Sequence, residues 1–246
     1  MGPDERGMES GRNYPRILRA GYDNDRGTAW NYYSVKSGRT IDALSMLERA
    51  AGYKALIDPT VLDLREQYPA YDIARMGKYL DDLTRRIPRS QVPTFDLLLT
   101  RKDSQAERGY SYEAVFIKYY DDLASAAVQR RMEREQRFCD ALNWRWTLCT
   151  EQDVPEARVE SARILCLLAN SLSLDAVRHQ CLTAVPKLLA RVDGRPLKAI
   201  RISLGRALGI APDQVGPLIA AMALHGFIEV DLDQPLEESS PLCLIK

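Results

Sequence analysis

The sequence predicts an α/β protein with a mixed-sheet domain followed by a mostly helical domain. Two apolar runs, 93–100 and 112–119, are rich in β-branched and aromatic residues and flank a charged turn that ends at Gly109, which is typical of a buried hairpin. Strand-like and helix-like segments alternate up to about residue 152, whereas helical spacing dominates afterwards. We therefore expect a flexible N-terminal arm at 1–27, a mixed-sheet domain at 28–152 and a helical domain at 153–246.

The charge of the chain is balanced. Residues 1–152 carry 24 Lys and Arg against 23 Asp and Glu, and residues 153–246 carry 10 against 11. A protein that grips DNA unaided usually has an excess of positive charge. If this chain acts on DNA, we expect a partner to bring it there.

The scarce residue types exclude several classes of protein. The chain has only two histidines, His179 and His225, which argues against a zinc hydrolase and against a nuclease that uses histidine as its base. Its five cysteines have no paired close spacing, so we expect reduced thiols in a cytoplasm. No apolar run approaches 18 residues and the N-terminus is polar, which predicts neither a membrane span nor a signal peptide.

The remaining elements of the first domain follow from apolar spacing and turn residues. Residues 70–92 are polar, and their arginines Arg85, Arg86 and Arg89 are expected on a solvated surface or, alternatively, against a phosphate. The other expected elements are a strand at 30–35, a helix at 42–56, a strand at 61–69 closed by Pro69, a long helix at 121–142 and a strand at 144–150.

Four charged residues fall inside these apolar patterns. Glu48 and Glu135 lie on the apolar faces of the two helices, and Asp96 and Lys118 lie within the two strands of the hairpin. Burying an unpaired charge costs several kcal/mol, so these side chains need one another, a metal ion or a substrate phosphate. A structural ion pair between Asp96 and Lys118 remains an alternative.

Arginines line the other sides of the 121–142 helix. Arg130, Arg131, Arg134 and Arg137 are expected to pair with Glu133 or to face solvent.

The second domain has the element order of a winged helix. Gln214 is the one base-reading side chain in the 212–224 helix, which holds no Lys or Arg, so protein docking is favoured over sequence reading. The expected elements are helices at 157–171, 173–191, 203–208 and 212–224, then strands at 227–232 and 241–245.

Several short segments together resemble a known nuclease family. They are Ser45-Met46-Leu47-Glu48, Val61 to Pro69, Thr94-Phe95-Asp96, Phe116-Ile117-Lys118 and Glu133-Arg134-Glu135. Over about residues 28–150 they resemble the TnsA endonuclease subunit of heteromeric, Tn7-like transposases. The resemblance implies a restriction-endonuclease-like, PD-(D/E)xK fold and a Mg²⁺-dependent endonuclease that cuts the 5′ strand at transposon ends.

The same resemblance implies roles for individual residues. Glu48, Asp96 and Lys118 would be catalytic, and Glu135 would belong to the site. Hard oxygen ligands suit Mg²⁺, with Mn²⁺ able to substitute, so Glu48, Asp96 and the main-chain carbonyl of Ile117 would hold the ion. Lys118 would orient or deprotonate the attacking water. The expected partners are DNA at the transposon ends, an integrase-type, TnsB-like subunit and a TnsC-like AAA+ ATPase, in a bacterial cytoplasm.

One residue departs from the family pattern. Phe116 stands two positions before Lys118, where most nucleases of this fold have Glu or Asp and the family can have Gln. A phenyl ring cannot ligate a metal. Two other functions therefore stay open: a catalytically weak adaptor between transposase and ATPase, and a stand-alone restriction-like nuclease.

Overall fold

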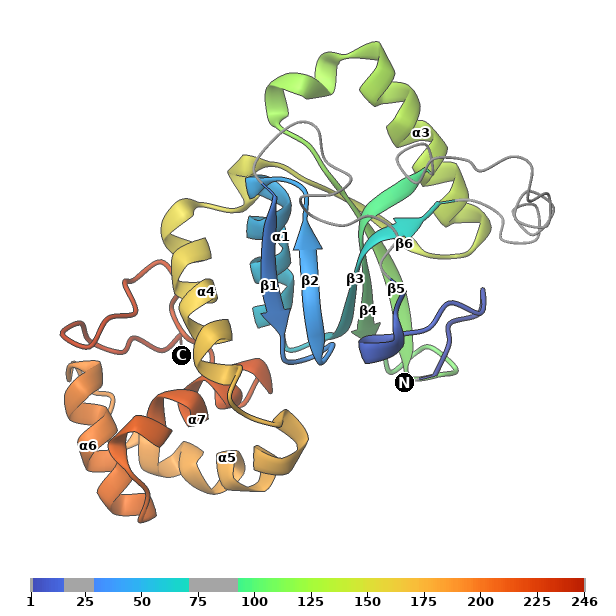
Figure 1. Cartoon of the computed structure of the whole chain (residues 1–246). Coiled ribbons are helices and arrows are strands. Elements are labelled where there is room, and N and C mark those ends of the chain that lie inside the picture. The colour runs from blue at the N-terminus through green and yellow to red at the C-terminus, as the bar shows by residue number, and fades with distance from the viewer. Residues whose placement is uncertain (1, 16–28, 71–92, 246) are drawn as a thin grey trace. The chain divides into compact units, whose positions relative to one another are not determined.

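The computed structural model of the chain describes residues 2–15, 29–70 and 93–245, which divide into two compact units (Figure 1). The first unit comprises Met1–Tyr32, Ser37–Gly52 and Val61–Asp153. The second comprises Tyr33–Lys36, Tyr53–Thr60 and Val154–Lys246. The arginines Arg85, Arg86 and Arg89 lie outside the described residues.

A four-stranded mixed sheet forms the centre of the first unit, as the sequence predicts. Its order is β3–β4–β5–β6, in which β3, β4 and β5 are antiparallel neighbours and β6 runs parallel to β5. A separate two-stranded sheet contains β1 and β2. The strands are β1 (Trp30–Ser34), β2 (Arg39–Ala43), β3 (Val61–Pro69), β4 (Thr94–Lys102), β5 (Tyr110–Ile117) and β6 (Arg145–Cys149).

The helices of the first unit differ in their bounds from the predicted ones. The residues from Arg39 to Ala43, partly assigned to a helix by the sequence, form β2, and α1 (Met46–Ile57) begins after them. The predicted 121–142 helix is interrupted at Ser125, whose backbone is extended between η3 (Tyr120–Ala124) and α3 (Ala126–Ala141). Two short 3₁₀ turns, η1 (Gly11–Asn13) and η4 (Glu151–Asp153), complete the unit.

Residues 2–15 pack against the sheet, so the predicted flexible arm is wrong for this part of 1–27. The Asp4 carboxylate accepts hydrogen bonds from Arg65 Nη1 and from the Tyr68 hydroxyl, both at 2.6 Å. Arg65 in β3 is almost completely buried and needs a counter-charge. Asp4 supplies this charge, which composition alone does not reveal. The Tyr14 hydroxyl adds a bond to the Glu66 carbonyl.

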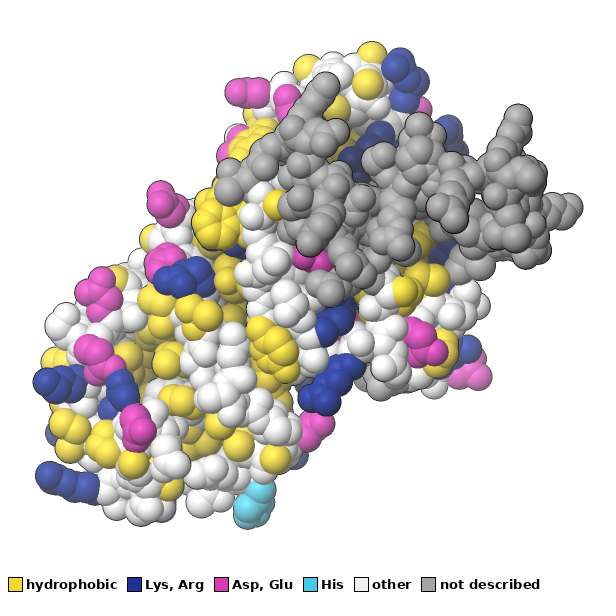
Figure 2. All heavy atoms as spheres, viewed as in Figure 1, with side chains coloured by type: hydrophobic (Ala, Val, Ile, Leu, Met, Phe, Trp, Pro, Cys, Tyr) yellow, Lys and Arg dark blue, Asp and Glu magenta, His cyan; other side chains and the backbone are white. Residues whose placement is uncertain are grey.

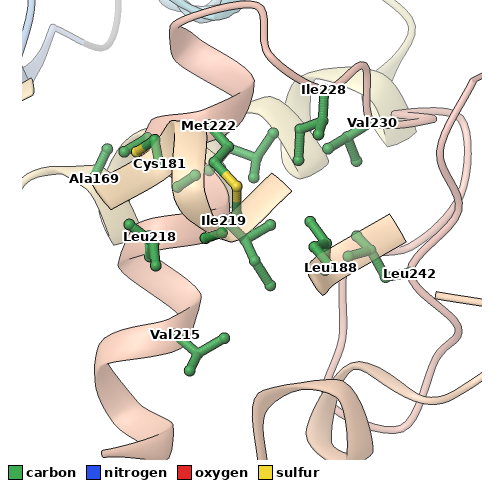
Figure 3. Packing of buried hydrophobic residues seen from close by; sticks show 14 of the residues in the cluster. Ala169, Cys181, Leu188, Val215, Leu218, Ile219, Met222, Ile228, Val230 and Leu242 are labelled. Carbon is green, nitrogen blue, oxygen red and sulfur yellow. The ribbon is translucent and has the colours of Figure 1, made fainter. Parts of the chain in front are cut away.

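The second unit is a helical domain built around α7. Its helices are α4 (Glu156–Ala169), α5 (Leu174–Leu189), α6 (Leu197–Leu208) and α7 (Pro212–Leu224). Helix α7 contacts each of the other three, and Figure 3 shows Val215, Leu218 and Met222 among the apolar side chains that fill this core. Helix α7 begins at Pro212 and continues through Pro217.

The winged-helix arrangement is not confirmed. The two strands expected at 227–232 and 241–245 form a single bridge between Val230 and Leu244, and a second bridge joins Pro196 to Pro241. Backbone pairing between the two segments is short for two reasons. The first segment ends in a turn closed by the hydrogen bond from Gln234 N to Asp231 O, and two prolines of the region lack an N–H to donate. None of the helices in the described part of the chain is by itself long and apolar enough to cross a membrane.

Candidate active site

Asp96 joins three elements of the first unit. It lies near the start of β4 and is 6% exposed. Its Oδ2 accepts the backbone N–H of Ile117 in β5 at 2.7 Å, and its Oδ1 accepts Nη2 of Arg131 in α3 at 2.8 Å. The carboxylate in this apolar strand is therefore satisfied by a backbone donor and a guanidinium, and not by Lys118.

Arg131 is held on several sides. Besides Asp96, it donates from Nε to Glu135 Oε1 at 2.7 Å, one helical turn later, and from Nη2 to the Thr94 carbonyl at 3.1 Å. Its guanidinium carbon lies 4.7 Å from the centre of the Phe116 ring. Asp96 and then Glu135 favour the charged form of Arg131 and outweigh its burial, so its pKa is raised. The sequence predicted solvent or Glu133 for this arginine, and that prediction is wrong.

Glu135 is the most buried acid of the group, with 1% of its surface exposed. Burial is the largest cause that raises its pKa to about 7; Arg131 lowers it, and the charge of Asp96 raises it further. Within the described ranges, its Oε2 and Nε1 of Trp146 are both buried without a hydrogen-bond partner. The Trp146 indole still favours the ionised carboxylate, without a bond of normal geometry. Glu135 therefore keeps one oxygen that receives no hydrogen bond of normal geometry from the described residues.

Glu48 enters the site from the start of α1. Its Oε2 accepts the backbone N–H of Leu44 at 2.9 Å and Nε2 of Gln67 at 3.3 Å, and Ser45 Oγ accepts the Glu48 N–H. Burial raises the pKa of Glu48 to about 7, and the negative charge of Asp96 is the second cause. The two carboxylates are thus near enough to repel each other.

Gln67 links Glu48 in α1 to Thr94 in β4. Its Oε1 accepts the Thr94 hydroxyl at 2.8 Å while its Nε2 donates to Glu48. Its φ of 47° lies in the left-handed region, which a residue other than glycine rarely adopts. Such strain persists where the surroundings hold it and is frequent at functional sites.

Lys118 does not lie inside an apolar strand, contrary to the prediction. β5 ends at Ile117, and the Lys118 side chain is 35% exposed. Its Nζ pairs with Oδ2 of Asp122 at 2.9 Å, four residues later. Lys118 follows Ile117, whose N–H binds Asp96, but it makes no hydrogen bond or ion pair to Glu48, Asp96 or Glu135 among the described residues.

Two of the carboxylates are of the kind that a divalent cation takes as ligands. No group of three or more His, Cys, Asp or Glu side chains in the described ranges is arranged to hold a metal ion. Glu48 and Asp96 do form a pair of hard oxygen donors, and each carboxylate oxygen can take more than one partner. A cation between them would relieve the repulsion that raises the pKa of Glu48. On the side of Glu135, the guanidinium of Arg131 already supplies positive charge.

Three side chains of this site were missed by sequence reasoning: Gln67, Thr94 and Arg131. For Arg131 a signal existed, because Glu135 follows it by four residues, the spacing at which helical residues pair. For Gln67 no local pattern predicts a left-handed residue inside a strand.

Comparison with known proteins gives one family match. Residues 58–151 match the family model for the TnsA-like endonuclease N-terminal domain. The match includes Asp96, Lys118, Arg131 and Glu135, whereas Glu48 lies before it. No curated protein matches the chain.

Proposed function

We propose that the chain, whose residues 58–151 match the TnsA-like endonuclease N-terminal domain, is a metal-dependent DNA endonuclease subunit of a Tn7-like transposase. In this proposal it hydrolyses one phosphodiester in the 5′ strand at each transposon end. The observation that carries it is the pair of carboxylates Glu48 and Asp96, close enough to repel each other, in which Asp96 Oδ2 accepts the N–H of Ile117 and Oδ1 accepts Arg131.

The residues present would hold one Mg²⁺ through Glu48, Asp96 and the carbonyl of Ile117. When bound, such an ion neutralises charge on the scissile phosphate and acidifies a water molecule. The chain's own contribution is to fix the two carboxylates: the N–H of Ile117 orients Asp96, and Leu44 and Gln67 orient Glu48. Preorganised groups of this kind need no rearrangement as charge develops.

Lys118 would act at the edge of the site. It stands at the exit of β5, directly after Ile117, and its ammonium group is held at the surface by Asp122. A partly exposed, strongly hydrated cation can exchange this surface partner for a phosphate oxygen at little cost. We assign Lys118 to orienting the attacking water and to stabilising the phosphate in the transition state.

The second unit would bring the nuclease to its substrate. The chain has no net charge, so partners must supply DNA affinity. Apolar side chains are gathered over the part of the surface that α4 and the C-terminal segment occupy (Figure 2). A cavity of about 1180 Å³ opens within this unit between α5, α7 and the segment 226–245. These features support docking of an integrase-type subunit or of a target-selecting ATPase.

Reconstituted cleavage tests the proposal. Full-length protein is combined with the integrase-type subunit and DNA carrying the transposon ends, and the new 5′ and 3′ termini are mapped with and without Mg²⁺. Asp96→Asn is the informative variant, because the amide oxygen can still accept the Ile117 N–H while the charge is lost. We expect it to remove the 5′-strand cut and to leave the 3′-strand cut of the partner intact. Wild-type cutting by this variant would refute the assignment.

The adaptor function is favoured by a single observation, which is Phe116 in place of a ligand. In that case the wild-type chain would support assembly with its partners but would make no cut of its own. The same mapping of termini separates the two functions.

A further inference from the structure

We propose that Arg131 is a fixed cation of the active site that occupies the place of a second metal ion, so that this chain works with one exchangeable divalent ion. The inference rests on the proposed nuclease function. It assigns Arg131 to binding the scissile phosphate through the part of its guanidinium that faces away from Asp96 and Glu135.

The contacts of Arg131 leave one end of the guanidinium available. Nε binds Glu135, and Nη2 binds both Asp96 and the Thr94 carbonyl. Nη1, with its two N–H donors, makes no hydrogen bond within the described part of the chain, and 34% of the side chain is exposed. A guanidinium fixed through Nε and Nη2 can still donate from Nη1 to a phosphate oxygen, in a charge-assisted hydrogen bond.

Phe116 explains why the guanidinium lies there. The ring is fully buried, stacks on Trp146 with centroids 6.0 Å apart, and presents its face to Arg131. An aromatic face attracts a cation, most strongly where water is excluded. A carboxylate at position 116 would instead offer oxygens to a metal ion. Phe116 therefore offers no metal ligand, and its ring packs against the guanidinium of Arg131 instead.

The formal charges of the site agree with one ion. Glu48, Asp96 and Glu135 contribute three negative charges when ionised, and Arg131 contributes one positive charge. A single divalent cation brings the site to neutrality before DNA arrives. A second would leave two uncompensated positive charges in a largely buried site, which is unfavourable unless more ligands are added.

Two measurements test this inference on the full-length protein. The first is the number of Mn²⁺ ions bound, determined by calorimetric titration and by electron paramagnetic resonance. We expect one ion for the wild type, and two for the double variant Arg131→Met with Phe116→Glu, which restores a ligand and removes the resident charge. Two tightly bound ions in the wild type would overturn the inference.

The second measurement is 5′-strand cleavage by Arg131→Met in the reconstituted complex. We expect a loss of about 10²–10³-fold, the usual effect of removing one preorganised donor from a transition state. Arg131→Lys keeps a charge but not the planar guanidinium, and we expect it to regain part of this loss. Arg134→Met on the exposed side of α3 is the matched control and should cut like the wild type.

The outcomes separate the two proposals. Wild-type or faster cutting by Arg131→Met would overturn the role of Arg131, and faster cutting would identify Arg131 as a block on Asp96. Absence of any 5′-strand cut by the wild type would instead refute the nuclease function itself. The Mn²⁺ count remains informative in that case, and melting curves show whether each variant is folded.

Discussion

Replacing Glu48 by glutamine should make the metal-free protein more stable at pH 8 and not at pH 5. Burial and the charge of Asp96 raise the pKa of Glu48 from 4.5 to about 7. A group whose pKa is higher in the folded state contributes stability that is complete below the unfolded pKa and is lost as the pH rises through the folded pKa. Ionised Glu48 should therefore cost about 3 kcal/mol of unfolding free energy at pH 8, at about 1.36 kcal/mol for each unit of pKa.

Glutamine keeps an oxygen for the Leu44 N–H but weakens the hydrogen bond from Gln67, at a cost of about 1 kcal/mol that applies at both pH values. The net gain at pH 8 should be about 2 kcal/mol. Urea unfolding of wild type and Glu48→Gln in a chelator, at pH 5 and pH 8, measures it. Glu135 titrates in both proteins, so its effect cancels in the comparison. Equal differences at the two pH values would refute the electrostatic reasoning.

Three further predictions concern burial. Asp4→Ala removes the nearer of the two carboxylates beside the buried Arg65, the other being Asp63, and should lower the unfolding free energy by about 3–5 kcal/mol; a loss below 1 kcal/mol in urea unfolding would show that the N-terminal segment is not a structural part of the sheet. Phe116→Ala empties a fully buried site beneath Arg131 and should cost about 3–5 kcal/mol by the same method, whereas Phe116→Leu should cost about 1 kcal/mol. In native protein an aromatic disulfide reagent should react first with the partly exposed Cys243, and fast labelling of any other thiol would contradict the packing. The four slow thiols are Cys139, Cys149, Cys166 and Cys181.

The sequence predicts the strands of the central sheet and the charged residues of the site, but it does not predict which charged residues pair with one another. β3, β4 and β5 follow from apolar runs bounded by turn residues, and Asp96 is conspicuous because it interrupts such a run. The partner of Asp96 could not be read from the sequence in the same way. Arg131 lies 35 residues away, and only the packing of α3 beside the start of β4 brings the two together.

Two other differences have the same origin in tertiary contacts. Lys118 lies one residue beyond the end of β5, and a strand end that differs by one position decides whether its side chain is buried or exposed. The N-terminal residues are polar in composition, as in a flexible arm, yet Asp4 is fixed because a buried arginine of β3 requires a counter-charge. The amino-acid composition predicts neither the residue at which β5 ends nor the ion pair between Asp4 and Arg65.

Glu48 and Asp96 together should hold one divalent cation, and calorimetric titration of Mg²⁺ into the full-length protein measures this binding. We expect the wild type to bind one ion and both Glu48→Gln and Asp96→Asn to lose most of this affinity. Glu113→Gln is the matched control, because Glu113 is another buried carboxylate of the sheet that is bound by Arg101 and Thr147 outside the site. Retained Mg²⁺ binding in Asp96→Asn, or an equal loss in Glu113→Gln, would contradict the claim.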